Sequence, residues 1–325
     1  MRDVADHLGV SRSAVSFAFN DQAQISSETR VRILTAAAKL GYRPNAGARA
    51  LAGRTTDLFG LVTDIVSTPF GGDLIAGAQE WLWEHGKSLI IVGTPTPERP
   101  DARSVEMMLE HRVGGVMVAT TWNRAIDVPA TLDGVPVVLV HCFDPSGRHP
   151  SVSPDEVSGG FAATKMLLDR GRRRIGMINL DSDLTAATGR LQGYRMALAD
   201  AGIQFDPALV VTGGATADGG FDAAQRLLRE REPDGVFCAN DRLAMGTYDA
   251  ARELNISIPT DLSVVGFDNQ ELIAKYLRPA LSTIALPFRE MGRRGAELLT
   301  QVLDPPSGNA PQVVLECPPI RRNSV

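Results

Sequence analysis

The chain has 325 residues, of which 44% are hydrophobic and 22% charged, and its formal net charge is −5. These proportions are those of globular proteins and exclude the disordered and fibrous classes, and no apolar run approaches the roughly 18 residues that a membrane span requires. The first residues are polar and alternate in charge, so we expect no signal peptide, no membrane partner and a cytoplasmic location.

The charge is unevenly distributed along the chain. Residues 1–54 hold eight Lys and Arg against four Asp and Glu, which gives this end +4 and leaves −9 for the rest. A basic end on an acidic body suggests a head that binds a polyanion.

The cysteines give no sign of a metal site. Cys142, Cys238 and Cys317 lie far apart, and the sequence has no CxxC pair and no Cys/His cluster. We therefore expect buried free thiols in a reducing compartment, with neither a metal nor a cofactor.

The first predicted helices lie on either side of a glycine. Val4 and Leu8 share one face of the first helix, which Gly9 ends, and Ser11 is a good N-cap for the second. The second helix turns its apolar residues inward: Ala14, Val15, Ala18 and Phe19.

A third helix is predicted to begin at Ser26 or Ser27 and to end at Gly41. It carries two adjoining apolar stripes, which are Val31, Leu34 and Ala38, and Ile33, Ala37 and Leu40.

Two short helices around a glycine indicate a helix-turn-helix. Its second helix presents polar side chains and one aromatic ring outward: Ser11, Arg12, Ser13, Ser16, Phe17 and Asn20. Small hydroxyl groups allow close approach to phosphates, and Arg12, at the helix N-terminus, can reach a guanine edge in a major groove. The alternative is a generic three-helix bundle without a DNA partner.

From residue 57 onward, apolar runs alternate with stretches of helical periodicity. This alternation predicts an α/β fold in which parallel sheets are covered on both faces. The runs are too many for one small sheet, so we expect two doubly wound halves that join near residue 156, with ligands bound at the carboxyl ends of the strands. The runs are "LFGLVTDIV", "SLIIVGT", "GGVMVAT", "VPVVLVHC", "RIGMINL", "LVVTGG", "GVFCAND" and "LSVVGFD".

The whole chain resembles one family. "DVADHLGVSRSAVSFAFN", "ISSETRVRI" and "LGYRPNAGARALAGR" are similar to the DNA-binding head of lac-repressor-like (LacI/GalR) transcription regulators. The body resembles the same family in "TPFGGDLIAGAQE", "GRLQGYRMAL", "GVFCANDRLAMG", "LSVVGFDN" and "LSTIALPFREMG". The resemblance implies a regulator, most simply a repressor, whose periplasmic-binding-protein-like body binds a small molecule and controls the affinity of the head for DNA.

The resemblance also implies roles in DNA binding. Arg12, Ser13 and Phe17 match base-reading positions, and the segment Asn45–Leu51, which includes Ala48, matches a hinge helix whose Leu51 wedges between base steps in the minor groove. The positions that match phosphate contacts are Ser11, Ser16, Asn20, Ser26, Thr29, Tyr42 and Asn45.

Two features depart from the family pattern. Phe17 stands where many members carry an Arg that contacts a base, and a phenyl ring can touch a thymine methyl but cannot hydrogen-bond, so we do not expect the usual half-site sequence. Relatives often carry a capping Thr before "DVA", and Met1 leaves no room for it. We expect either a start further upstream or a frayed first helix.

The resemblance implies six effector-binding positions: Phe70, Asp155, Arg190, Asn240, Asp268 and Phe288. Their chemistry suits a sugar, because carboxylates, amides and guanidinium groups pair with hydroxyls and an aromatic face covers a sugar ring. For each of these residues the alternative role is to cap a helix or to form a turn, and this alternative is strongest for Asn240. Thr120 and His141 also end strands, and we interpret His141 as structural. Ala215 stands where relatives that bind planar bases carry an aromatic residue, which disfavours a purine.

The predicted domains follow from these motifs. Residues 1–44 form the helix-turn-helix domain, 45–56 the hinge helix and linker, and 57–325 the effector-binding and dimerisation domain. Within the last, the N-subdomain comprises about 57–156 and 287–312, and the C-subdomain about 157–286 and 313–325. No leucine heptad follows the last helix, so a homodimer on a pseudo-palindromic double-stranded operator is the simplest assembly.

Two other classes of protein compete with this interpretation. An exported sugar-binding receptor of a transport system would need a signal peptide and would not need the helix-turn-helix. An enzyme on a doubly wound fold is not indicated, because the sequence has no GxGxxG after a strand, no P-loop and no GxSxG.

Overall fold

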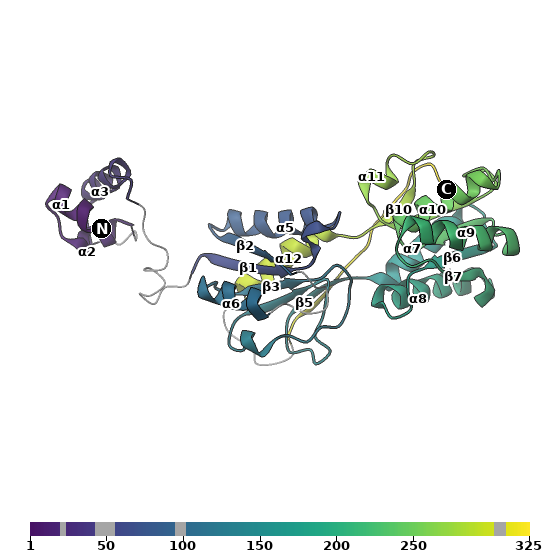
Figure 1. The fold of residues 1–325 in the computed structure, drawn as a ribbon, viewed down its shortest axis with the longest axis horizontal. Coiled ribbons are helices and arrows are strands. Elements are labelled where there is room, and N and C mark those ends of the chain that lie inside the picture. Colours follow the sequence, from purple (N-terminus) through teal and green to yellow (C-terminus); the bar gives the residue numbers. More distant parts are fainter. Residues whose placement is uncertain (20–23, 43–55, 95–101, 302–309) are drawn as a thin grey trace.

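The computed structural model describes residues 1–19, 24–42, 56–94, 102–301 and 310–325 (Figure 1). The expected hinge helix and linker lie almost wholly outside the described residues. So do four of the predicted DNA-binding positions, which are Asn20, Asn45, Ala48 and Leu51.

The head consists of three helices around a small apolar core: α1 (Arg2–Leu8), α2 (Arg12–Phe19) and α3 (Ser27–Lys39). Gly9, at φ 63°, ends α1 in the left-handed conformation that glycine tolerates, so the chain can turn at once into α2. The buried core residues are Val4, Ala5, Val15, Ala18, Ile33, Ala36 and Ala37.

Two of the predicted N-caps are confirmed. The amide of Ala14 donates to Oγ of Ser11 over 3.0 Å, and the amide of Thr29 donates to Oγ of Ser26 over 3.2 Å. In contrast, α1 follows Met1 without a side-chain cap.

The two apolar stripes predicted on α3 are buried only in part. Ile33 and Ala37 lie in the core, whereas Val31 is 63% exposed and Leu34 and Leu40 also face outward. The core side of α3 is therefore narrower than the two stripes together, because α1 and α2 pack against only one side of this helix.

The first subdomain of the body is built on a sheet of six parallel strands in the order β11-β5-β4-β3-β1-β2. Its strands are β1 (Leu58–Thr63), β2 (Ser88–Gly93), β3 (Val116–Ala119), β4 (Val137–Val140), β5 (Ser151–Pro154) and β11 (Gln312–Leu315). Its helices are α5 (Gly71–Glu84), α6 (Ala102–Glu110) and α12 (Phe288–Gln301), with short 3₁₀ turns at η1 (Ile65–Ser67) and η2 (Ala130–Leu132). One apolar core joins the sheet to α5 and α12, and another joins it to α6.

The second subdomain has a sheet in the order β12-β10-β9-β8-β6-β7, parallel except for β12. Its strands are β6 (Ile175–Asn179), β7 (Val210–Thr212), β8 (Gly235–Cys238), β9 (Ser263–Asp268), β10 (Ser282–Ala285) and β12 (Pro319–Ile320). Its helices are α7 (Glu156–Asp169), α8 (Thr185–Asp200), α9 (Ala217–Arg231), α10 (Asp241–Glu253) and α11 (Glu271–Ala274), with a 3₁₀ turn at η3 (Pro207–Leu209). The predicted fold class, two mainly parallel α/β subdomains behind a helical head, is confirmed.

The chain crosses between the subdomains three times (Figure 1). The crossings lie between β5 and α7, between β10 and α12, and between β11 and β12. The last of these differs from the expectation that residues 313–325 belong to the second subdomain. Val313 pairs with Val152 and Leu315 with Pro154, so the chain leaves the first sheet only after Leu315.

The expectation that the cysteines are buried free thiols is confirmed. Cys142, Cys238 and Cys317 are free and buried, and burial raises the pKa of each thiol to about 12. These thiols are therefore inert packing groups.

Candidate functional site

The start of α2 presents the side chains that a DNA-reading helix needs. Ser11, Arg12 and Ser13 are exposed at its first turn, while Ser16 and Phe17 are half-buried further along. Arg12 remains the predicted base contact, because the N-terminal residues of a recognition helix are those that reach base edges.

Two other predicted DNA contacts also support the head. Oγ of Ser26 donates to Oγ1 of Thr29 over 2.9 Å at the start of α3. The ring of Tyr42 packs edge-on against Phe19 with centroids 5.6 Å apart. These residues fix the third helix and the exit of the chain from the head.

The junction between the subdomains is organised around Arg190, on α8. Its side chain is 2% exposed, and Nε donates to Oε2 of Glu156 over 2.7 Å. Nη1 donates to the carbonyl oxygen of Ala239, at the end of β8, and lies 3.7 Å from Oδ1 of Asp268. The guanidinium also stacks 3.7 Å above the ring centroid of Phe267. Such a group is held in one orientation.

Asp268 ends β9 and shares this cluster. Burial raises the pKa of its carboxyl from 3.8 to about 7, while Arg190 and a hydrogen bond from Gln270 oppose the rise. Near neutral pH the carboxyl can therefore donate as well as accept a hydrogen bond. Its backbone has φ 105°, a left-handed conformation that is strained for a residue with a side chain.

Two aromatic rings from the first subdomain form the other side of the candidate site. Phe70 stacks on Phe288 with centroids 4.8 Å apart and planes inclined by 22°. Phe288 in turn contacts His141 edge-on, with centroids 5.2 Å apart. The two predicted aromatic positions thus lie together, next to the end of β4.

His141 links the two sides. Burial lowers its pKa, while the charge of Glu156 opposes the change and that of Arg190 adds to it. His141 belongs to the first subdomain and the two charged groups belong to the second, so their electrostatic effect on the ring acts across the junction. Nδ1 bonds to the carbonyl oxygen of Thr120 over 3.0 Å.

Asp155 and Asn240 are helix caps, which was the alternative for each. Asp155 accepts from the amide of Ser158 at the start of α7. Asn240 accepts from the amide of Leu243 over 2.8 Å and donates to the carbonyl oxygen of Ala215 over 3.3 Å. The structure thus brings Arg190 to Asp268 and Phe70 to Phe288, whereas these two polar groups have partners within the protein.

Sequence reasoning missed Glu156 and set His141 aside. Glu156 directly follows Asp155 and resembles an ordinary acid in a first helical turn, and its partner Arg190 is 34 positions away. The one available signal for His141 was its place at the end of a buried strand. Among the described residues, no group of three His, Cys, Asp or Glu is arranged to hold a metal ion, and no helix is long and apolar enough to cross a membrane.

Comparison with known proteins agrees with both parts of the chain. Residues 1–45 match the family model "Bacterial regulatory proteins, lacI family", and residues 164–325 match "Periplasmic binding protein-like domain". The ribose operon repressor of Haemophilus influenzae is 32% identical over 100% of this chain and 98% of its own length.

Two solved structures extend the comparison. A complex of the transcriptional regulator CelR with cellobiose superposes with a TM-score of 0.70 at 31% identity, over 99% of this chain and 98% of that one. The lac repressor dimer bound to operator and an anti-inducer superposes with a TM-score of 0.85 at 25% identity, over 99% and 97%. These matches favour a DNA-binding regulator over an exported receptor. The chain therefore belongs to the lacI family of bacterial regulatory proteins and is a DNA-binding transcriptional regulator.

Proposed function

We propose that the protein is a repressor that binds a pseudo-palindromic operator as a homodimer and changes its affinity for DNA when a sugar binds at the subdomain junction. The observation that supports the sugar site best is the buried Arg190 with its two carboxylate neighbours, one of which, Asp268, lies at the end of β9, where α/β folds bind ligands. Stacked Phe70 and Phe288 supply the apolar face that a sugar ring requires.

The effector class rests on the relatives. The similar proteins include a ribose operon repressor and a regulator in complex with cellobiose. We assign the effector contacts to Phe70, Asp155, Arg190, Asn240, Asp268 and Phe288. Asp155 and Asn240 contact the effector either while they cap their helices or after their side chains have left the caps. The sugar is bound and released unchanged, and the protein acts in the cytoplasm, where its DNA partner is.

The domain roles follow the same division. Residues 1–44 read DNA, 45–56 form the hinge, and the body senses the effector. Arg12, Ser13 and Phe17 contact bases, the hydroxyl and amide side chains around them contact phosphates, and the hinge residues Ala48 and Leu51 enter the minor groove. At the C-terminal end of the chain, we assign the residues up to Leu315 to the first subdomain and the residues after it to the second.

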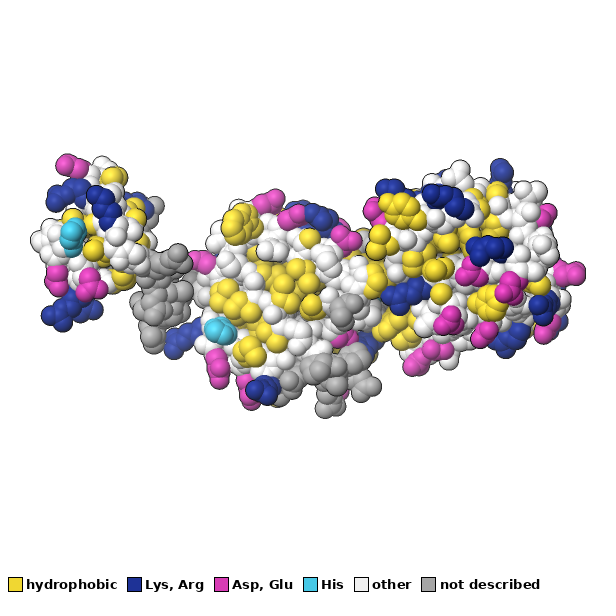
Figure 2. All heavy atoms as spheres, turned by 45° about the horizontal axis from the view of Figure 1, so that its top comes forward, with side chains coloured by type: hydrophobic (Ala, Val, Ile, Leu, Met, Phe, Trp, Pro, Cys, Tyr) yellow, Lys and Arg dark blue, Asp and Glu magenta, His cyan; other side chains and the backbone are white. Residues whose placement is uncertain are grey.

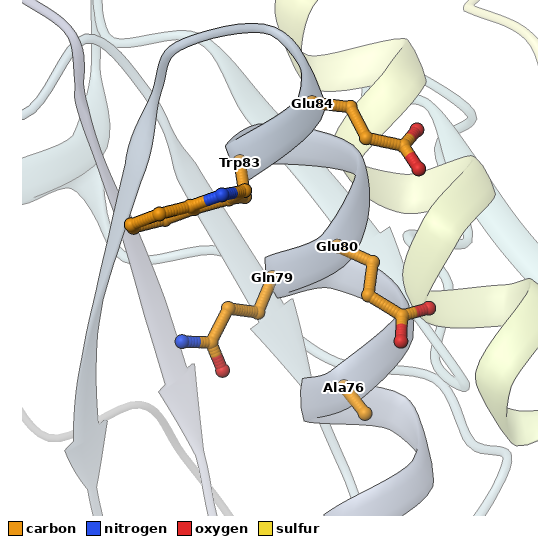
Figure 3. A pocket seen from close by; sticks show the side chains of 5 residues that line it. All are labelled: Ala76, Gln79, Glu80, Trp83 and Glu84. Carbon is orange, nitrogen blue, oxygen red and sulfur yellow. The ribbon is translucent and has the colours of Figure 1, made fainter.

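The dimer is supported by the outer face of α5. Trp83 is 76% exposed there and borders a surface hollow of ≈ 340 Å³ lined by Ala76, Gln79, Glu80, Trp83 and Glu84. Figure 3 shows all five side chains projecting from this one helix, with Trp83 and Gln79 on one side and Glu80 and Glu84 on the other. A large exposed indole is typical of a protein interface.

The test is fluorescence anisotropy of the full chain on labelled DNA from its own upstream region, at fixed salt because phosphate contacts make the affinity salt-dependent. Ribose, cellobiose and related sugars are added in turn. We expect tight binding to one palindromic site and a change of at least about tenfold in affinity with one sugar, a coupling of the usual size. Release would identify an inducer, and tightening a corepressor.

The same titration separates the alternatives. Specific binding that no sugar changes would reject the sugar effector and retain the regulator. Turnover of the sugar, followed by chromatography of the mixture, would show an enzyme instead.

A further inference from the structure

The cation at the junction is already neutralised. Arg190 faces two carboxylates, Glu156 at 2.7 Å and Asp268 at 3.7 Å, and one of its N–H groups is taken by the carbonyl of Ala239. The side chains of all three residues are more than nine-tenths buried. The cluster therefore has no surplus positive charge to offer an anionic ligand.

The cluster does have a surplus acceptor. Oε2 of Glu156 accepts from Arg190, but its other oxygen, Oε1, is buried and has no hydrogen-bond partner among the described residues. A buried carboxylate oxygen without a donor is unfavourable, so a donor on a bound molecule would be favoured at this point.

A second acceptor lies on the other side of the junction. A carbonyl oxygen cannot donate, so the bond between Nδ1 of His141 and the oxygen of Thr120 places the ring proton on Nδ1. Because burial keeps the ring neutral, Nε2 of His141 is left as an acceptor. Glu156 and His141 are close enough for the charge of one to act on the other.

We propose that Glu156 and His141 are further effector-contacting residues, and that they select a neutral or amino sugar, whose hydroxyl or ammonium groups donate to Oε1 of Glu156 and Nε2 of His141, and reject acidic sugars. The inference rests on the proposed sugar-binding function and adds the charge class of the ligand. The remaining N–H groups of Arg190 donate to sugar hydroxyls, which accept as well as donate.

The test uses the full-length protein and neutral sugars beside charged derivatives that keep the same ring: ribose and ribose 5-phosphate, and glucose, glucosamine, glucuronate and glucose 6-phosphate, in addition to cellobiose. Binding is measured by isothermal titration calorimetry and by the shift of the melting temperature. We expect binding to be confined to neutral or amino sugars, with each acidic counterpart at least about tenfold weaker because it places a like charge beside a buried carboxylate.

The variant Glu156→Gln then tests the residue itself. It keeps the shape of the side chain but removes its charge, so we expect the affinity for the preferred sugar to fall about tenfold and the discrimination against its acidic counterpart to shrink by a similar factor. The matched control is Asp169→Asn, at the opposite end of the same helix α7, which changes the net charge equally and is expected to change neither value.

Three outcomes overturn the inference. An acidic sugar that binds the wild-type protein as tightly as its neutral counterpart would contradict it while leaving the proposed function intact. Unchanged discrimination in a folded Glu156→Gln protein would remove Glu156 from the site. If no sugar of any charge binds, the sugar-binding function and this inference both fail. Should Glu156→Gln not fold, the comparison of sugars on the wild-type protein still decides.

Discussion

At the scale of single residues, the junction depends on charges that are buried together. Asp268 shows the consequence for stability. Burial raises the pKa of its carboxyl from 3.8 to about 7, so between these values the folded protein holds a proton that the unfolded chain has released. The free energy of unfolding therefore falls as the pH rises through this window.

The pH dependence can be measured with Asp268→Asn, which has no carboxyl to ionise. From pH 4 to 7, the free energy of unfolding of the wild-type protein should fall relative to that of the variant by up to ~1.4 kcal/mol for each pH unit. Urea denaturation at several pH values gives both curves. The exposed Asp218→Asn serves as control, and its curve should run parallel to the wild-type one. Parallel curves for Asp268→Asn would contradict the prediction.

The Arg190–Glu156 pair gives a second prediction at this scale. Arg190→Met leaves the buried carboxylate of Glu156 without its cation, and we expect a loss of roughly 3 to 5 kcal/mol in stability. Replacing both residues, with Arg190→Met and Glu156→Gln, removes the uncompensated charge. The double variant should therefore be more stable than Arg190→Met alone, as measured by denaturant unfolding. If the loss of stability in the double variant equals the sum of the losses in Arg190→Met and in Glu156→Gln, the two side chains do not interact.

At the scale of elements, three pairs of helices cross at glycines. In each pair, a Cβ atom added to either glycine would overlap the backbone of the partner helix. The pairs are α5 with α12 (Gly77 and Gly292), α7 with α8 (Gly160 and Gly193), and α9 with α10 (Gly220 and Gly246). The close approach of backbones accounts for glycine at positions where helix propensity disfavours it.

Gly193→Ala tests this packing. Its Cβ would meet the carbonyl oxygen of Val157 and the amide nitrogen of Phe161, which are backbone atoms and cannot turn away. We expect a loss of about 1 to 3 kcal/mol. Gly72→Ala is the matched control, because Gly72 lies on α5 with open space around it and should gain up to ~1 kcal/mol. Equal thermal unfolding of both variants would contradict the helix contact.

The same scale shows what the sequence could predict. Each of the eight apolar runs is a strand, because parallel strands covered on both faces need continuous apolar side chains. The strands that went unnoticed are the short β5, β10, β11 and β12, whose residues mix polar and apolar types. The sheet that β11 joins depends on its partner β5, about 160 residues earlier, and local periodicity carries no such information. Glu156 went unnoticed for the same reason.

At the scale of the whole molecule, an exposed apolar face joins the two subdomains. On the second subdomain, Leu272 is 85% and Tyr276 58% exposed at α11, and Met245 is 39% exposed on the adjoining α10. Figure 1 shows α11 along the same long side of the molecule as α5, which carries Trp83, and Figure 2, with this side turned forward, shows hydrophobic side chains exposed on both subdomains. We expect this face to hold the partner in the proposed dimer.

Leu272→Asp tests this face and, with it, the link between assembly and DNA binding. A buried carboxylate in an apolar interface is costly, so the dissociation constant of the dimer should rise at least about tenfold in sedimentation experiments. A palindromic operator needs two heads held at a fixed spacing, so the affinity for operator should fall with it, while sugar binding within each protomer should remain. Met196→Asp, an exposed methionine on α8, is the control for surface charge and should change neither property. If the dimer persists in Leu272→Asp, the interface lies elsewhere on the molecule. If the dimer is lost but the affinity for operator is unchanged, a single head is sufficient for DNA binding.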